Sequence, residues 1–219
     1  MSKKLISFDL DQTLVETTRA HSSAFRYAFQ KKGIKVNEKV IWPFIDGRYS
    51  EEVILSIAKK IKIKLNEEQV AAIKKLHHFF LRKTHKYAKP ISRAEKTLKE
   101  LKKRYNLALL TNCAKGEAYF LIKASKIPKK IFNIIVLADQ VKHPKPFPDG
   151  ILKAEHLLHV KSDIHVGDSI YDIIAAKRAK AVSIAVLTGQ ASRSKLKKYK
   201  PDYIINSVAE LSNLMKKID

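Results

Sequence analysis

From Pro90 onward, short apolar runs alternate with helical segments, and this alternation constrains the fold more than any other feature of the sequence. Together with a first strand near the N-terminus, the expected strands cover residues 5–9, 107–110, 134–137, 164–166, 182–186 and 203–205. The expected helices of this region cover residues 94–103, 115–125, 148–158, 170–180, 192–198 and 207–217. Apolar strands that alternate with helices build a mainly parallel sheet with helices on both faces. The sequence therefore predicts an α/β fold.

Between the first strand and this alternation, the chain has helical periodicity and no convincing strand. Residues 17–32 carry small and aromatic side chains at helical spacing and stop at Gly33. Asn37, Ser50 and Asn66 are expected to cap the following helices, because their side chains can accept a backbone N–H at a helix start. We therefore expect a small helical bundle inserted into the α/β fold.

Asp9 and Asp11 follow the first apolar run directly. Residues two apart in an extended chain point to the same side, so both carboxylates can face one site. Two like charges held that close raise each other's pKa unless a cation neutralises them. A divalent metal ion explains the pair, and the alternative is a pair of turn or helix-cap aspartates.

Other strand ends also carry polar residues, and parallel sheets bind ligands beyond the carboxyl ends of their strands. Thr111 and Asn112 follow the expected strand 107–110 and offer a hydroxyl and an amide to phosphate oxygens, or they cap the next helix. Lys145 lies between two prolines, which restrict the backbone and can hold the ammonium over a site. There it would offset carboxylate charge and contact a phosphoryl oxygen, whereas a surface turn is the alternative.

Asp168 and Asp172 follow the expected strand 164–166 across a glycine turn. If a helix starts near Ser169, these residues lie at neighbouring positions on one helix face. Acids also stabilise a helix N-terminus by themselves, which is the alternative interpretation. Four carboxylates at two strand ends, with polar partners at two others, indicate together a site at the carboxyl edge of the sheet.

In chain order, the segments DLDQT, Thr111-Asn112, KPFPD and GDSIYD resemble the four motifs of the haloacid dehalogenase superfamily, and specifically of its phosphoglycolate phosphatase-like branch. The resemblance covers nearly the whole chain. It implies a Rossmann-like core domain over residues 1–14 and 90–219, with an all-helical cap domain over residues 15–89. It also implies a Mg²⁺-dependent phosphatase for a small phosphorylated metabolite, with phosphoglycolate first among the candidates.

The resemblance implies a role for each carboxylate. Asp9 would be the nucleophile that forms an aspartyl-phosphate, and Asp11 would be the general acid/base. Mg²⁺ would be held by the Asp9 carboxylate, the Asp11 backbone carbonyl and the Asp168 carboxylate. Asp172 would assist the metal through water or by supporting its ligands.

The resemblance also implies substrate-binding residues. Thr111 and Lys145 would position and neutralise the phosphoryl group, with Asn112 assisting. Arg48, in the segment DGRYSE, resembles part of a substrate-specificity loop and could reach a carboxylate or a second phosphate on the substrate. The alternative for Arg48 is a solvated side chain in an ordinary interhelical turn.

The chain departs from the family pattern at Gln12 and at Lys180, where the family usually has glycine. Neither departure removes a catalytic group, but both bear on positive backbone φ angles. His77, His78 and His85 lie in an expected helix without acidic partners at ligand spacing. We therefore expect these histidines to serve packing or to lie at the surface.

The chain is strongly basic, with 44 Lys and Arg against 21 Asp and Glu and a net charge of +23. The basic residues are mostly lysines dispersed along the chain, which is typical of solvated helix faces. Such charge raises encounter rates with phosphorylated substrates and does not predict dedicated nucleic-acid binding. Two alternatives stay open: a sugar phosphomutase with the same four motifs, and a basic module that binds phosphorylated nucleic-acid ends.

The sequence carries no signal for a membrane or for secretion. It has no apolar run of 18 residues, and the short apolar run at the N-terminus ends in acids. The single Cys113 excludes an intrachain disulfide framework and fits a reducing compartment. We expect a cytoplasmic monomer or homodimer.

Overall fold

The computed structural model describes residues 3–218 of the chain. In this part, six parallel strands form one sheet in the order β5-β4-β1-β6-β7-β8. Their bounds are Leu5–Phe8 (β1), Asn106–Thr111 (β4), Ile134–Leu137 (β5), Ser162–Gly167 (β6), Val182–Val186 (β7) and Tyr203–Ile205 (β8). The expected α/β fold and each of the expected strands are confirmed.

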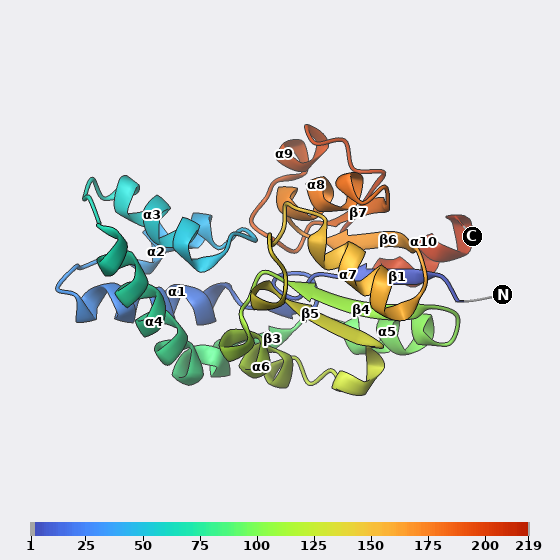
Figure 1. Ribbon diagram of the computed structural model, residues 1–219, viewed down its shortest axis with the longest axis horizontal. Coiled ribbons are helices and arrows are strands. Elements are labelled where there is room, and N and C mark those ends of the chain that lie inside the picture. Colours follow the sequence, from blue (N-terminus) through green and yellow to red (C-terminus); the bar gives the residue numbers. More distant parts are fainter. Residues whose placement is uncertain (1–2, 219) are drawn as a thin grey trace.

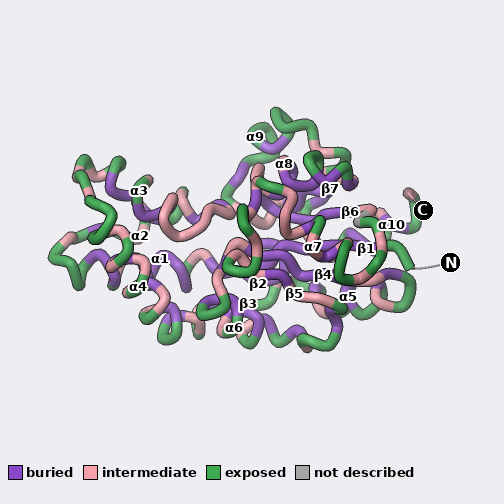
Figure 2. The backbone as a smooth tube through the Cα atoms, viewed as in Figure 1, coloured by how far each residue is buried: buried purple, intermediate pink, exposed green. Residues whose placement is uncertain are grey.

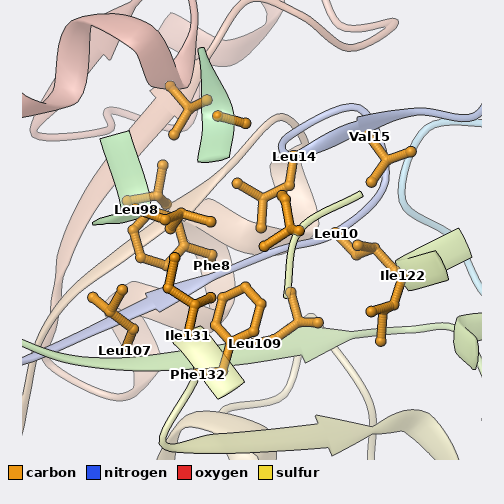
Figure 3. Close-up of a cluster of buried hydrophobic side chains, with 14 of the residues drawn as sticks. Phe8, Leu10, Leu14, Val15, Leu98, Leu107, Leu109, Ile122, Ile131 and Phe132 are labelled. Carbon is orange, nitrogen blue, oxygen red and sulfur yellow. The ribbon is translucent and has the colours of Figure 1, made fainter. Parts of the chain in front are cut away.

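Helices cover both faces of this sheet (Figure 1). They are α5 (Ala94–Lys102), α6 (Lys115–Ala124), α7 (Asp149–Leu158), α8 (Ile170–Arg178), α9 (Arg193–Lys197) and α10 (Leu211–Ile218). Successive strand residues point to opposite faces, so Leu107 and Leu109 join one buried cluster with residues of α5, α6 and α10 (Figure 3). Ala108 and Leu110 join the other cluster, with residues of α7 and α8.

The remaining helices form a separate helical part at one end of the molecule (Figure 1). We use this name for α1 (Thr18–Lys31), α2 (Glu38–Ile41), α3 (Ser50–Lys60), α4 (Glu67–Thr84) and their connections. Its own apolar core includes Phe25, Phe29, Ile54 and Ile73. Figure 2 shows buried segments within these helices. Within residues 3–218, no helix combines the length and apolar character needed to cross a lipid bilayer.

Two short antiparallel strands connect the helical part to the sheet part. These strands are β2 (Val15–Glu16) and β3 (Lys89–Pro90), and Val15 pairs with Pro90. The sequence did not predict this ribbon, because two-residue strands carry no periodicity. The carboxyl ends of the long strands point toward the helical part (Figure 1), so the expected site lies where the two parts meet.

Short 3-10 helices complete the described structure at Trp42–Phe44, His85–Tyr87, Lys129–Ile131, Ala138–Gln140 and Val208–Glu210. Two expected helix caps are confirmed, since Asn37 and Asn66 both accept backbone N–H groups at helix starts. The cap predicted at Ser50 is wrong: Tyr49 precedes α3, and Ser50 is its first residue. Its hydroxyl is thereby free to bond across to the sheet part.

The two family departures both occur at positions with positive φ. Gln12 has a φ of 59° and Lys180 also has a φ of 59°, so non-glycine residues occupy left-handed backbone here. Gln12 is buried, and its side-chain amide contacts Thr17 and Thr18 at the start of α1. Gln12 thus combines a left-handed backbone with side-chain contacts to the start of α1.

Candidate active site

The carboxyl ends of β1, β4 and β6 lie side by side at the edge of the sheet that faces the helical part (Figure 1). Because β1 lies between β4 and β6, the residues that follow these strands are neighbours in space. Asp9 follows β1, Thr111 closes β4 and Asp168 follows β6, and all three side chains are buried. Lys145 reaches the same place from the loop after β5. The structure therefore brings together the strand-end residues that the sequence singled out.

Lys145 is the electrostatic centre of this group. Its ammonium nitrogen lies 2.5 Å from Asp9 Oδ1 and 2.6 Å from Asp172 Oδ1, and it donates to the carbonyl of Leu110 at 3.2 Å. Burial by itself would lower the pKa of Lys145, but the two carboxylates outweigh burial and raise that pKa. The lysine is therefore charged and held in place, and it is not a solvated surface group.

Asp172 holds Lys145 in place from the first turn of α8. One oxygen contacts Lys145 and, at 3.1 Å, His165 Nε2, while the other accepts the backbone N–H and the hydroxyl of Ser169. Burial opposes ionisation of Asp172, but Lys145 and His165 outweigh it and hold its pKa below the ordinary range. Asp172 thus caps the start of α8 and also holds Lys145 in the site. The sequence had left these two roles as alternatives.

Asp9, Asp168 and Asp172 form a group of carboxylates whose oxygens lie within 4.8 Å of one another. Burial, together with the charges of Asp172 and Asp11, raises the pKa of Asp9 to about 7 despite the nearby lysine. Burial and the charge of Asp9 likewise raise the pKa of Asp168 well above its ordinary value. The negative charge therefore exceeds what Lys145 neutralises, and an all-oxygen site of this kind suits Mg²⁺.

Two glycines leave the space that the carboxylates occupy. A Cβ on Gly189 would lie 1.8 Å from Asp168 Oδ2, and a Cβ on Gly167 would lie 2.1 Å from Asp172 Cγ. Any larger residue would displace one of the carboxylates. The sequence singled out Gly167 as a turn, but Gly189 lies beyond β7 and becomes part of the site only through the fold.

Asp11 belongs to a second network, which faces the helical part. Its Oδ1 accepts the hydroxyl of Thr17 at 2.6 Å and lies 3.2 Å from His21 Nε2, while Oδ2 accepts the thiol of Cys113 at 3.1 Å. Burial opposes ionisation of Asp11, but these partners, led by His21, hold its pKa below the ordinary range. Asp11 in turn raises the pKa of His21 against the effect of burial. The two side chains can therefore share a proton.

Thr111 and Asn112 are held by hydrogen bonds within the protein. Thr111 Oγ1 accepts the backbone N–H of Cys113 at 3.0 Å. The Asn112 amide donates to the carbonyls of Gly47 and Lys145, both at 2.9 Å, and accepts the N–H of Lys145 at 3.0 Å. Asn112 therefore connects the helical part, the end of β4 and the lysine loop, which is a positioning contribution that the sequence did not predict.

A cavity of about 40 Å³ lies between the two parts, and Asp9, Asp11, Gly47 and Arg48 line it. The Arg48 guanidinium also contacts both oxygens of Asp46, at 2.9 and 3.0 Å, and donates to the hydroxyl of Ser56 at 2.7 Å. These contacts exclude the alternative of a solvated arginine in an ordinary interhelical turn, while the substrate role expected for Arg48 stays a prediction. Arg48 borders the cavity from a fixed position in the helical part.

One part of the expectation for the histidines is wrong, namely that they lack acidic partners, whereas His77 does pack, since it is buried and stacked on Phe25. His77 and His78 of α4 both have an acidic partner, Glu117 of α6, which comes from the other part of the molecule. His77 also lies 3.1 Å from His21, so a chain of contacts runs from Asp11 to Glu117. Residue spacing within α4 could not reveal Glu117, because Glu117 belongs to α6. The signal available in the sequence was His77 itself, a polar residue on an otherwise apolar face of the helix.

Comparisons with known proteins agree with this arrangement. The family model described as haloacid dehalogenase-like hydrolase matches residues 6–186. A pyrophosphatase PpaX of Bacillus mycoides (strain KBAB4) is 26% identical, with all of both chains aligned. A solved structure described as a predicted phosphoglycolate phosphatase from Haemophilus somnus 129pt has a TM-score of 0.85 and 23% identity, over 97% of this chain and 98% of the other. A hydrolase from Pseudomonas syringae has a TM-score of 0.84 and 23% identity, over 99% of both chains.

Proposed function

The chain belongs to the haloacid dehalogenase-like hydrolase family, and we propose that it is a Mg²⁺-dependent phosphatase for a small, strongly anionic substrate. Phosphoglycolate is the first candidate substrate, and pyrophosphate is the second. The observation that carries this proposal is the contact of Lys145 with Asp9, inside a group of buried carboxylates whose charge the lysine only partly neutralises. Such a site suits a phosphoryl group together with a divalent cation.

The reaction would proceed through two displacements at phosphorus. An Asp9 oxygen attacks the phosphorus while the bond to the leaving oxygen breaks, and Asp11 donates a proton to that oxygen. Asp11 then takes a proton from a water molecule, whose oxygen attacks the aspartyl-phosphate and releases Asp9 and phosphate. Lys145 stays on the transferring oxygens throughout. Mg²⁺, held by Asp9, Asp168 and the Asp11 carbonyl, would neutralise phosphoryl charge.

Asp11 needs a proton for the first displacement, and His21 can supply it. The carboxylate alone is ionised, because its contacts hold its pKa below the ordinary range. His21 touches it at 3.2 Å and has a raised pKa, so a proton on the pair is available beside the leaving oxygen. We propose that Asp11 transfers the proton and that His21 positions Asp11.

The size of the cavity supports a small substrate. A cavity of about 40 Å³ between the two parts leaves no room for a bulky leaving group in this arrangement. We propose that the helical part acts as a cap domain over residues 15–89 and excludes water from the phosphoryl group. Pyrophosphate is included because a relative aligned over its whole length is named a pyrophosphatase, and because the +23 net charge favours a highly charged substrate.

A phosphate-release assay with Mg²⁺ tests the proposal directly. The substrates are phosphoglycolate, pyrophosphate, a sugar phosphate with and without a bisphosphate primer, and a phosphorylated oligonucleotide. We expect fast release from phosphoglycolate or pyrophosphate without any primer. Primer-dependent isomerisation of the sugar phosphate would instead indicate a mutase. Salt-sensitive binding of the oligonucleotide without turnover of any small phosphate would indicate a nucleic-acid module.

A further inference from the structure

His77, His78 and Glu117 form a second cluster of ligand-type side chains, away from the carboxylate group. Their ligand atoms lie within 4.8 Å of one another, with His77 Nδ1 at 3.0 Å and His78 Nε2 at 3.1 Å from Glu117 Oε1. The two histidines come from α4 and the glutamate comes from α6, so the cluster spans the contact between the helical part and the sheet part.

Three groups converge on one oxygen in this cluster. Glu117 Oε1 accepts the hydroxyl of Ser50 at 3.2 Å and has both imidazole nitrogens beside it, while Oε2 accepts the backbone N–H of Ala114. A carboxylate oxygen offers about two lone pairs. Both ring nitrogens are buried, and apart from this oxygen neither has a hydrogen-bond partner among residues 3–218. Buried polar atoms of this kind need an explanation.

Two members of the cluster are buried, with His77 0% and Glu117 2% exposed. Burial lowers the pKa of His77 to about 4. Burial opposes ionisation of Glu117, but the two imidazoles outweigh it and hold its pKa well below the ordinary value. The cluster thus combines a fully buried imidazole with a buried carboxylate.

We propose that His77, His78 and Glu117 bind a divalent transition-metal ion of the Zn²⁺ type, which joins the helical part to the sheet part. Two imidazoles and one carboxylate form a ligand set that suits Zn²⁺ and does not suit Mg²⁺. Ligand atoms around such an ion lie about 3.4 Å apart, close to the separations seen here. The site is therefore distinct from the carboxylate group in both place and chemistry.

The surroundings supply the other features of such a site. His77 Nε2 lies 3.1 Å from His21 Nδ1. With the ion on His77 Nδ1 and His21 neutral, the Nε2–H of His77 would donate to His21 and orient the metal-bound imidazole. A cavity of about 210 Å³ borders His78 and Glu117 and leaves space for a water ligand and an entry path. The side chain of His78 is 28% exposed, so an ion can reach the cluster.

Metal binding is measured on the full chain, stripped of metal and kept in excess Mg²⁺ so that the carboxylate group is supplied. Calorimetry with Zn²⁺ should show one site per chain, and Zn²⁺ should raise the melting temperature. Glu117→Gln and His78→Ala should each weaken Zn²⁺ binding by more than about tenfold, because a ligand is lost. His85→Ala is the matched control, since His85 lies at the end of α4 outside the cluster, and it should bind like the natural chain.

A rival cluster makes the experiment decisive. Asp11, His21 and Cys113 also lie within ligand distance of one another, but they contain a thiol. Co²⁺ at the proposed site should give visible absorption without a sulfur-to-cobalt charge-transfer band. Such a band, lost in Cys113→Ser, would place the ion at the rival cluster and overturn the proposal.

Undiminished Zn²⁺ affinity in both Glu117→Gln and His78→Ala, or no Zn²⁺ binding by the natural chain, would also overturn it. His78→Asn, with melting measured without metal, separates lost ligation from lost folding.

Discussion

The sheet part and the helical part border the same cavity, but they place their side chains by different means. Asp9 and Asp168 follow paired strands and Thr111 ends one, so backbone hydrogen bonds determine their positions. His21 and Arg48 are placed by side-chain contacts that reach Asp11, Asp46 and Ser56. We therefore expect changes in the sheet part to abolish the chemical step, and changes in the helical part to alter proton delivery and substrate affinity.

The largest effect is expected at the nucleophile. Asp9→Asn keeps the shape of the side chain and removes the attacking charge, so kcat should fall more than about a thousandfold. Asp139→Asn is the matched control, because Asp139 also follows a sheet strand but is exposed, and it should change kcat little. Phosphate release by both purified variants measures the contrast. Substantial turnover by Asp9→Asn would contradict the covalent mechanism.

Removal of Mg²⁺ should have the next largest effect, since it leaves the carboxylates of the sheet part without their counter-charge. EDTA should lower the rate at least about a hundredfold, and added Mg²⁺ should restore it. Ca²⁺ should support turnover poorly, because its coordination is looser. EDTA already saturated with Mg²⁺ is the control. Full activity after exhaustive chelation would mean that Lys145 neutralises the site without a metal.

Gly189→Ala tests whether the backbone around Asp168 is as restrictive as the structure indicates. The new Cβ would lie 1.8 Å from Asp168 Oδ2, so the carboxylate must move and turnover should fall about a hundredfold. The unfolding free energy should fall by about 1–3 kcal/mol. Gly150→Ala in α7 meets nothing within 4 Å and should leave turnover unchanged. Equal behaviour of the two variants in turnover and denaturation assays would remove Gly189 from the site.

His21→Asn probes the helical part and should have a smaller effect, roughly a tenfold loss in kcat. His21 helps to hold the pKa of Asp11 below its ordinary range, so its loss should raise that pKa. A higher pKa leaves less ionised Asp11 at any given pH for the second displacement, in which Asp11 takes a proton from water, so the acid limb of the pH–rate profile for that step should move to higher pH. His156→Asn, at an exposed position on α7, should leave the profile in place. An unmoved profile in His21→Asn would show that the pair does not share its proton.

The smallest effect is expected for Arg48→Ala, because Asp46 and Ser56 already occupy much of the guanidinium. KM for phosphoglycolate or pyrophosphate should rise by up to about tenfold, while an aryl phosphate without a second anionic group should change little. Steady-state kinetics on both substrates measure the difference. Equal losses for both would assign Arg48 to the structure of the helical part.

Much of the sheet part was predictable because its signals are local. Apolar runs predicted β1, β4 and β6, and the polar residues after them predicted where ligands bind. The ribbon of β2 and β3 was missed because each strand has only two residues. Ser50 was interpreted as a helix cap, whereas its hydroxyl donates to Glu117, a partner that lies 67 positions away in the chain.

The sequence by itself determined the α/β fold, the inserted helices and the strand-end positions of Asp9, Thr111 and Asp168, because hydrophobic periodicity and strand length are properties of short segments. Only the tertiary structure decided that Lys145 contacts both Asp9 and Asp172 and that Gly189 must lack a side chain. The cluster of His77, His78 and Glu117 likewise exists only because α4 packs against α6. Contacts between side chains far apart in the chain depend on how whole elements pack, and no local pattern records that packing.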